Sequence, residues 1–280
     1  MAGDGVWIVT GASRGIGAAI ARMAVESGHK VALIARGESV MALAQSLGES
    51  AAGFQCDVAD SVSVSETVDA IVARFDRVTV LVNNAGVHRG GKVHRLTDDA
   101  WQEVLQVNLT GAMNMTRAAV PHMSEGCSVI NVGAVVGFRG FPGDSAYASS
   151  KAGLSGLTKA LAIELAPKAI TANLVIPGLV LTEMTSELSE AALDKMTQQI
   201  PLRRFAEDRE VAPRFYRQSI TATARLINLS TGQLLQEATN HGEALFEFES
   251  DLSTSKRNTQ AEAANELARL LFSDLIETWQ

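Results

Sequence analysis

The sequence predicts an α/β fold in which a parallel sheet carries helices on both faces, followed by a C-terminal segment of different character. Short apolar strands alternate with helical stretches, a glycine-rich turn follows the first strand, and the composition changes near residue 213. Strands that are apolar along their whole length are typical of parallel sheets buried on both faces. The expected strands are VWIVT at 6–10, VALIA at 31–35, VTVLV at 78–82, SVINV at 128–132 and TANLVIP at 171–177.

Length and composition agree with a globular chain that acts on small molecules or proteins. The 280 residues suffice for one large α/β domain or two domains, and 46% hydrophobic with 20% charged residues excludes a disordered chain. A net charge of -7 argues against nucleic acid and anionic membranes as partners. The N-terminus does not resemble a signal peptide and no apolar run is long enough for a membrane span, so we expect a cytoplasmic protein.

Neither a metal site nor a disulfide framework is expected. The two cysteines, Cys56 and Cys127, lie far apart and belong to no motif with metal-ligand spacing. We interpret both as buried thiols.

The composition predicts two parts, residues 1–213 and residues 214–280. The first part holds 21 of the 23 glycines and all 6 prolines. In the second part, alternating runs at 219–229, 233–239 and 244–249 predict a β-meander of three short strands. An apolar stripe at helical spacing over 260–279 predicts a terminal helix.

The glycine-rich turn after the first strand is the predicted binding site for a dinucleotide. It reads TGASRGIG over 10–17 and leads into the helix-forming run AAIARMAVES. Gly11 and Gly15 let the backbone approach a pyrophosphate, and Gly17 permits close helix packing. Free N–H groups at the start of the helix favour an anion. The turn therefore predicts a doubly wound sheet of the Rossmann type.

The residue at the end of the second strand indicates which cofactor is bound. A carboxylate there would accept hydrogen bonds from a ribose 2′-hydroxyl, but this strand ends in Arg36. Together with Arg14 of the glycine turn, Arg36 can neutralise a 2′-phosphate, which favours NADP over NAD. A solvated surface charge is the alternative interpretation of Arg36.

A series of motifs in this chain resembles the short-chain dehydrogenase/reductase family. They are TGASRGIG, then CDV at 56–58, NNAG at 83–86, Asn108, YASSK at 147–151, and Pro177-Gly178 with Thr182. GAVVGFRGFPGDSAYASSKAGLSGLTKALAIELA at 133–166 and IPLRRFAE at 200–207 are most similar to the 3-oxoacyl-acyl-carrier-protein reductases of fatty acid biosynthesis. The resemblance covers about residues 5–212.

The resemblance implies a set of site residues. Tyr147 would donate a proton to the carbonyl that receives the hydride, and Lys151, one helical turn later, would favour the phenolate and hold the nicotinamide ribose. Asn108 would fix a water that relays protons to the lysine. The expected cofactor-binding residues are Gly11, Ser13, Arg14, Ile16, Gly17, Arg36, Asp57, Val58, Asn84, Ala85, Gly86, Tyr147, Lys151, Pro177, Gly178, Val180 and Thr182.

One departure from the family lies at the expected substrate position. The family has a serine 13 residues before the tyrosine, where its hydroxyl binds the substrate carbonyl, and this chain has Ala134. Loss of one oriented donor costs on the order of 100- to 1000-fold in rate, so we expect impaired catalysis.

A second departure is the C-terminal part. Thr231 to Leu235 is interpreted either as a substitute for the family's last strand or as part of an unrelated module. The pattern TATARLINLSTGQLL with a terminal helix faintly resembles lipopolysaccharide-assembly lipoproteins, and no function is inferred from it.

Three functional hypotheses follow. The resemblance implies an NADPH-dependent, homo-oligomeric enzyme, a dimer or tetramer, that reduces a 3-oxoacyl thioester or similar ketone supplied as a small molecule or on a carrier protein. The alternatives are an NADP-binding sensor or scaffold without useful turnover, and a chimeric chain whose tail is an interaction module.

Overall fold

The computed structural model describes residues 5–182, 197, 204–208, 211, 215–227 and 234–247. It divides into two compact units. The first is Gly3–Ala212, and the second is Pro213–Gln280 together with Met1–Ala2. The first unit carries the candidate site.

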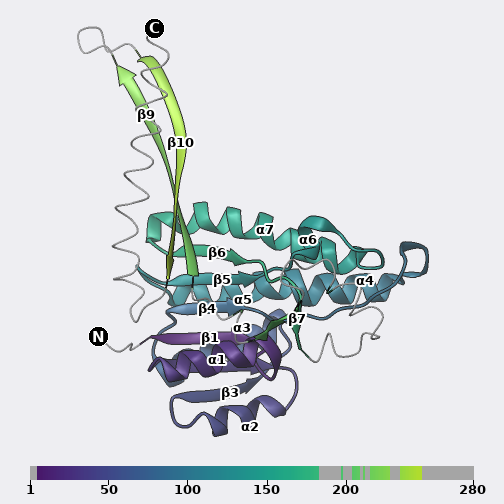
Figure 1. The fold of residues 1–280 in the computed structure, drawn as a ribbon. Helices are drawn as coiled ribbons and strands as arrows, with labels where there is room; N and C mark the ends of the chain where they lie inside the picture. The colour runs from purple at the N-terminus through teal and green to yellow at the C-terminus, as the bar shows by residue number, and fades with distance from the viewer. Residues whose placement is uncertain are drawn as a thin grey trace. The chain divides into compact units, whose positions relative to one another are not determined.

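The first unit is built on a parallel sheet of six strands in the order β3-β2-β1-β4-β5-β6 (Figure 1). The direction of winding reverses between β1 and β4, because the chain runs outward from β1 to β3 and then crosses back to β4. In open α/β sheets ligands bind at such a reversal, beyond the carboxyl ends of the strands. The strands are β1 (Val6–Thr10), β2 (Lys30–Ala35), β3 (Ala51–Gln55), β4 (Val80–Asn83), β5 (Ser128–Val132) and β6 (Thr171–Val175).

Two separate hydrophobic clusters show that both faces of the sheet are covered. One cluster joins the sheet to the helices α3, α5 and α7, and the other joins it to α1 and α2. This arrangement explains why β1 is buried at all five positions. The helices are α1 (Gly15–Glu26), α2 (Ser39–Ser46), α3 (Ser61–Phe75), α4 (Asp98–Leu105), α5 (Gly111–Ala119), α6 (Val136–Arg139) and α7 (Ser145–Leu165). No helix in the described ranges is long and apolar enough to cross a membrane.

Short elements complete this unit. They are the π-helical turn η2 (Gln106–Thr110), the 3-10 turns η1 (Val93–Arg95), η3 (Val120–His122) and η4 (Ala166–Lys168), and the small strands β7 (Val180–Leu181) and β8 (Ala206–Glu207), which pair in parallel. Cys56 and Cys127 are buried free thiols, as predicted.

The doubly wound parallel sheet is confirmed, and each predicted strand is present. The sequence did not predict β3, because its segment AAGFQ contains no β-branched residue. It forms a strand because it pairs in register with β2 from Val31↔Ala51 to Ala35↔Gln55. Tertiary pairing here outweighs weak local propensity.

The second unit contains two long strands where the sequence predicted three short ones. β9 (Phe215–Ile227) and β10 (Leu234–Glu247) form an antiparallel pair. The prediction of a break near residues 240–243 was wrong because backbone pairing continues through Asn240, His241 and Gly242 opposite Ala222, Thr221 and Ile220. The proposed substitute for the family's last strand is also overturned, since Leu234 pairs with Ile227 and β10 lies outside the six-stranded sheet. The predicted helix over 260–279 lies outside the described residues.

Candidate active site

A cleft of about 740 Å³ opens at the carboxyl ends of the strands, where the winding reverses. The residues that line it come from the glycine turn, from the ends of β2, β4 and β5, from the start of α7 and from the segment after β6. Nearly all the predicted site residues line this one cleft, namely Gly11, Ser13, Arg14, Ile16, Arg36, Asp57, Val58, Asn84, Ala85, Gly86, Ala134, Tyr147, Lys151, Pro177, Gly178, Val180 and Thr182. Gly17 and Asn108 do not line it.

The glycine turn forms a backbone cradle at one end of the cleft. Gly11 and Gly15 have φ angles of +63° and +52°, in the left-handed region that favours glycine. A Cβ on Gly17 would collide with the carbonyl oxygen of Gly11, so this glycine lets α1 begin directly against the turn. Gly17 therefore shapes the cradle from behind, and the N–H groups at the start of α1 remain available to an anion.

Two arginines flank the cradle. Arg14 and Arg36 are both exposed, and neither guanidinium forms an ion pair within the described ranges. The Arg36 carbonyl accepts a hydrogen bond from Gln55 Nε2 at 2.9 Å, which fixes the backbone there. Next to them, Asp57 Oδ1 accepts a hydrogen bond from the Ala59 N–H at 2.9 Å. Among the residues that the structure describes, this end of the cleft thus offers two arginines without an ion-pair partner and one fixed carboxylate.

Hydrogen bonds between the ends of β1 and β4 hold the floor of the cleft. Thr10 Oγ1 accepts from the N–H groups of Asn84 and Ala85 at 2.9 and 3.0 Å. Asn84 Nδ2 donates to the carbonyl oxygens of Thr10 and Gly11 at 2.9 and 3.2 Å. These bonds fix the turn that begins at Asn84 against the end of β1.

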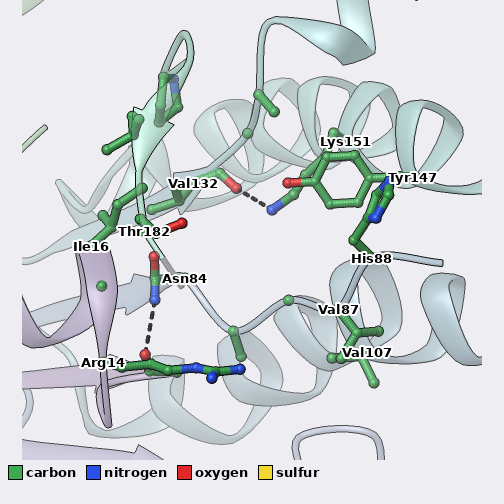
Figure 2. Close-up of a pocket in the computed structure, with 18 of the residues that line it drawn as sticks. Arg14, Ile16, Asn84, Val87, His88, Val107, Val132, Tyr147, Lys151 and Thr182 are labelled. Carbon is green, nitrogen blue, oxygen red and sulfur yellow. Dashed lines mark hydrogen bonds between the residues drawn. The ribbon is translucent and has the colours of Figure 1, made fainter. Parts of the chain in front are cut away.

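Tyr147 and Lys151 project from α7 into the middle of the cleft (Figure 2). They occupy positions i and i+4 and therefore share one face of the helix. Lys151 Nζ lies 5.7 Å from the centre of the Tyr147 ring and donates a hydrogen bond to the Val132 carbonyl oxygen at 2.7 Å. The carbonyl of Val132, at the end of β5, is a contact that the sequence did not reveal.

Burial shifts the pKa values of both residues in this pair. Burial, reinforced by the nearby Asp144 carboxylate, raises the pKa of Tyr147 to about 12. Burial also lowers the pKa of Lys151 to about 8. Desolvation and the neighbouring negative charge of Asp144 therefore set the net shift of the Tyr147 pKa, and the expected stabilisation of the phenolate by Lys151 stays a prediction. The phenol accordingly keeps its proton at neutral pH.

Asn108 connects three parts of the site from behind the cleft wall. It lies in the π-helical turn η2, a feature that recurs at functional sites. Its Oδ1 accepts from the Val87 N–H at 2.8 Å, and its Nδ2 donates to the Val87 carbonyl and to Ser150 Oγ, both at 3.0 Å. Ser150 Oγ in turn donates to the Tyr147 carbonyl at 2.7 Å. Asn108 therefore ties the loop after β4 to the helix that carries Tyr147, and the expected water at this residue stays a prediction.

Ala134 lines the cleft between β5 and α6, at the position where the family has a hydroxyl. Backbone hydrogen bonds hold both of its neighbours, from Gly133 N–H to the Val175 carbonyl at 2.8 Å and from Val135 N–H to the Pro177 carbonyl at 3.0 Å. The backbone of this loop is thus well fixed, while the side chain offers no hydrogen-bond donor.

Sequence reasoning missed a pair of residues beside the tyrosine. His88 Nε2 lies 2.8 Å from Asp144 Oδ1, and the His88 ring meets the Tyr147 ring edge-on, with centroids 5.2 Å apart. Both residues line the cleft. They belong to separate loops 56 residues apart in sequence, and neither falls in a motif that would have signalled the pairing.

Comparisons with known proteins agree with this geometry. Residues 5–193 match the protein family described as short chain dehydrogenase. The chain is 39% identical over 212 residues to the 3-oxoacyl-(acyl-carrier-protein) reductase FabG of Staphylococcus epidermidis, covering 73% of this chain and 87% of that one. It is 42% identical over 212 residues to the human 3-oxoacyl-(acyl-carrier-protein) reductase, covering 75% and 88%. A short chain dehydrogenase from Burkholderia cenocepacia, solved in complex with NADP, is 34% identical and superimposes with a TM-score of 0.71 over 75% of this chain and 88% of the other.

Proposed function

The chain belongs to the short-chain dehydrogenase family of oxidoreductases, and from this premise we propose that it is an NADPH-dependent reductase of 3-oxoacyl thioesters or similar ketones. One observation carries the proposal. A tyrosine and a lysine on one helical face share a single cleft with a glycine cradle and two arginines. This set combines a nucleotide site with a proton donor, as hydride transfer to a carbonyl requires.

The residues present fit NADP. The left-handed φ angles of Gly11 and Gly15 open a cradle that a Cβ at Gly17 would close, which suits a pyrophosphate. Arg14 and Arg36 would hold the 2′-phosphate, and Asp57 with Val58 would contact the adenine. Pro177, Gly178, Val180 and Thr182 would contact the nicotinamide end, and Lys151 would bind its ribose.

The reaction divides between cofactor and protein. NADPH, when bound, supplies the hydride, and the chain supplies the proton and the orientation. Tyr147 would donate its hydroxyl proton to the carbonyl oxygen as negative charge develops there. Because burial raises the pKa of Tyr147 to about 12, its hydroxyl stays protonated at neutral pH. Lys151, charged below about pH 8, would stabilise the phenolate that remains, and the Val132 carbonyl holds the ammonium in place.

Ala134 leads us to propose that turnover is weak in this chain. A serine hydroxyl at this position would bind the carbonyl oxygen beside Tyr147, and alanine cannot. The same observation supports a second candidate, an NADP-binding protein that acts as a sensor or scaffold without useful turnover.

The acyl group would arrive as a small-molecule thioester or on a carrier protein, and the enzyme would be a homo-oligomer. Light scattering of the full chain tests the oligomer directly.

The test of the function is NADPH oxidation with an acetoacetyl thioester, after fluorescence titration has shown that NADPH binds. We expect slow turnover that Tyr147→Phe abolishes without loss of NADPH affinity. Binding without oxidation, both in this chain and after Ala134→Ser, would refute the reductase and support the second candidate.

A further inference from the structure

The His88–Asp144 pair stands beside the reacting tyrosine without a role in the proposed reaction. The His88 and Asp144 side chains are joined at 2.8 Å. The His88 ring lies against the Tyr147 ring, as Figure 2 shows, and the interplanar angle is 79°. Resting on the proposed function, we infer that His88 is a positioning residue, which holds the Tyr147 ring in its reactive orientation where residue 134 provides no hydroxyl to do so. Asp144 would fix His88 in turn.

Asp144 binds His88 and does not make the hydrogen bond that is usual for its position in α7. It occupies the N-cap of α7, where an aspartate side chain normally accepts a hydrogen bond from an N–H of the first turn. Its carboxylate makes no such bond and is directed to His88 instead. The usual N-cap hydrogen bond is thus replaced by a contact with His88 inside the cleft. Such departures from local preferences are expected at functional sites.

The loop that carries His88 is held in place by hydrogen bonds and an ion pair. On one side, the Val87 backbone makes two hydrogen bonds to Asn108. On the other side, Arg89 forms a two-pronged ion pair with Glu103, at 2.7 and 2.8 Å. Further along, the Gly91 N–H donates to the Gly143 carbonyl at 2.8 Å, so this loop is also fastened to the one that carries Asp144. His88 is therefore presented to Tyr147 from a fixed backbone.

No hydrogen bond orients the Tyr147 phenol among the residues that the structure describes. Within the described ranges the Tyr147 hydroxyl has no hydrogen-bond partner, so packing determines the direction of the ring. The edge of one aromatic ring against the face of another is a favoured arrangement. Ala134 makes this packing more important than it would be beside a serine.

A double-mutant cycle tests the compensation. His88→Ala should lower kcat about tenfold in the chain as it stands, because small misplacement of a reacting group is costly. In an Ala134→Ser background the same change should cost less than about threefold. His88→Phe should restore most of kcat because it keeps an aromatic edge. Equal losses in both backgrounds, or no rescue by phenylalanine, would overturn the inference.

Matched controls separate positioning from a general disturbance. His94 is exposed, lies six positions further along and does not line the cleft, so His94→Ala should leave kcat unchanged. NADPH affinity should be the same in all variants. A loss in His88→Ala that falls on NADPH affinity alone would also contradict a positioning role.

A spectroscopic readout does not depend on turnover. The chain has two tyrosines, Tyr147 and Tyr216, so a Tyr216→Phe chain labelled with 3-fluorotyrosine reports on Tyr147 alone by ¹⁹F NMR. His88→Ala should shift and broaden the signal, while His88→Phe and His94→Ala should keep it narrow. An unchanged signal in His88→Ala would refute the inference. If no variant reduces any ketone, the proposed function fails, and this measurement still decides whether His88 holds the ring.

Discussion

Replacing Ala134 by serine should restore an interaction that the cleft is shaped to provide. The backbone on both sides of residue 134 is hydrogen-bonded to the segment after β6, through Val175 and Pro177. Ala134 itself lines the cleft with Tyr147 and is only partly buried. A serine hydroxyl therefore has room, and its direction is set by a backbone that is already fixed.

The expected gain follows from the value of one oriented donor at a developing oxyanion. Such a donor contributes about 3 to 4 kcal/mol to transition-state stabilisation, or on the order of 100- to 1000-fold in kcat. Because the added hydroxyl would contact the substrate carbonyl and not the cofactor, NADPH affinity should not change. The assay is the loss of NADPH absorbance with an acetoacetyl thioester, comparing kcat and kcat/KM of the two chains under identical conditions.

Ala134→Cys is the matched control, since it adds similar bulk with only a weak donor. It should gain less than about tenfold, whereas serine gains about 100-fold or more. Equal gains from cysteine and serine would show that filling space matters and the hydroxyl does not. No gain from serine, with NADPH bound, would refute the assignment of this position.

Three further predictions concern the cofactor site and the catalytic pair. Arg36→Ala should weaken NADPH binding about tenfold and leave NADH binding unchanged, because a charge-assisted bond to the 2′-phosphate is lost, whereas the exposed Arg22→Ala should change neither in a fluorescence titration. Gly17→Ala should abolish NADPH binding in the same titration, since its Cβ meets the Gly11 carbonyl, while Gly156→Ala, which faces open space on α7, should bind normally. With a pKa of about 8 for Lys151 and about 12 for Tyr147, kcat for reduction should be level at neutral pH and fall above about pH 8, and Lys151→Arg should move that fall to higher pH.

The sequence predicted the fold where its signals are local. Apolar strands, a glycine turn and helical stretches sufficed for the doubly wound sheet and for the cofactor cradle. β3 escaped because AAGFQ has weak strand propensity and depends on its pairing with β2. The continuous β10 was missed because Asn240 to Gly242 has the composition of a turn, whereas its conformation is set by the partner strand.

The site was predictable where a motif fixes the backbone and not where loops meet. Gly11, Gly15 and Gly17 signal their role because only glycine satisfies the geometry. The contact between His88 and Asp144 depends on how two loops pack against each other, and the sequence of either loop does not predict this packing. The direction of the Tyr147 pKa shift was also not predictable from the sequence, since it depends on burial and on Asp144.

The two halves of the cleft are built from these two kinds of residue. The cofactor half is built from backbone geometry, so it should tolerate most side-chain changes except at the glycines and the arginines. The other half, where we propose that the substrate binds, contains side chains that contact one another, from Asp144 through His88 to Tyr147, and it also includes Ala134. Substitutions there should change turnover far more than NADPH affinity. Ala134→Ser should therefore change kcat, while the nucleotide site in the other half keeps its affinity for NADPH.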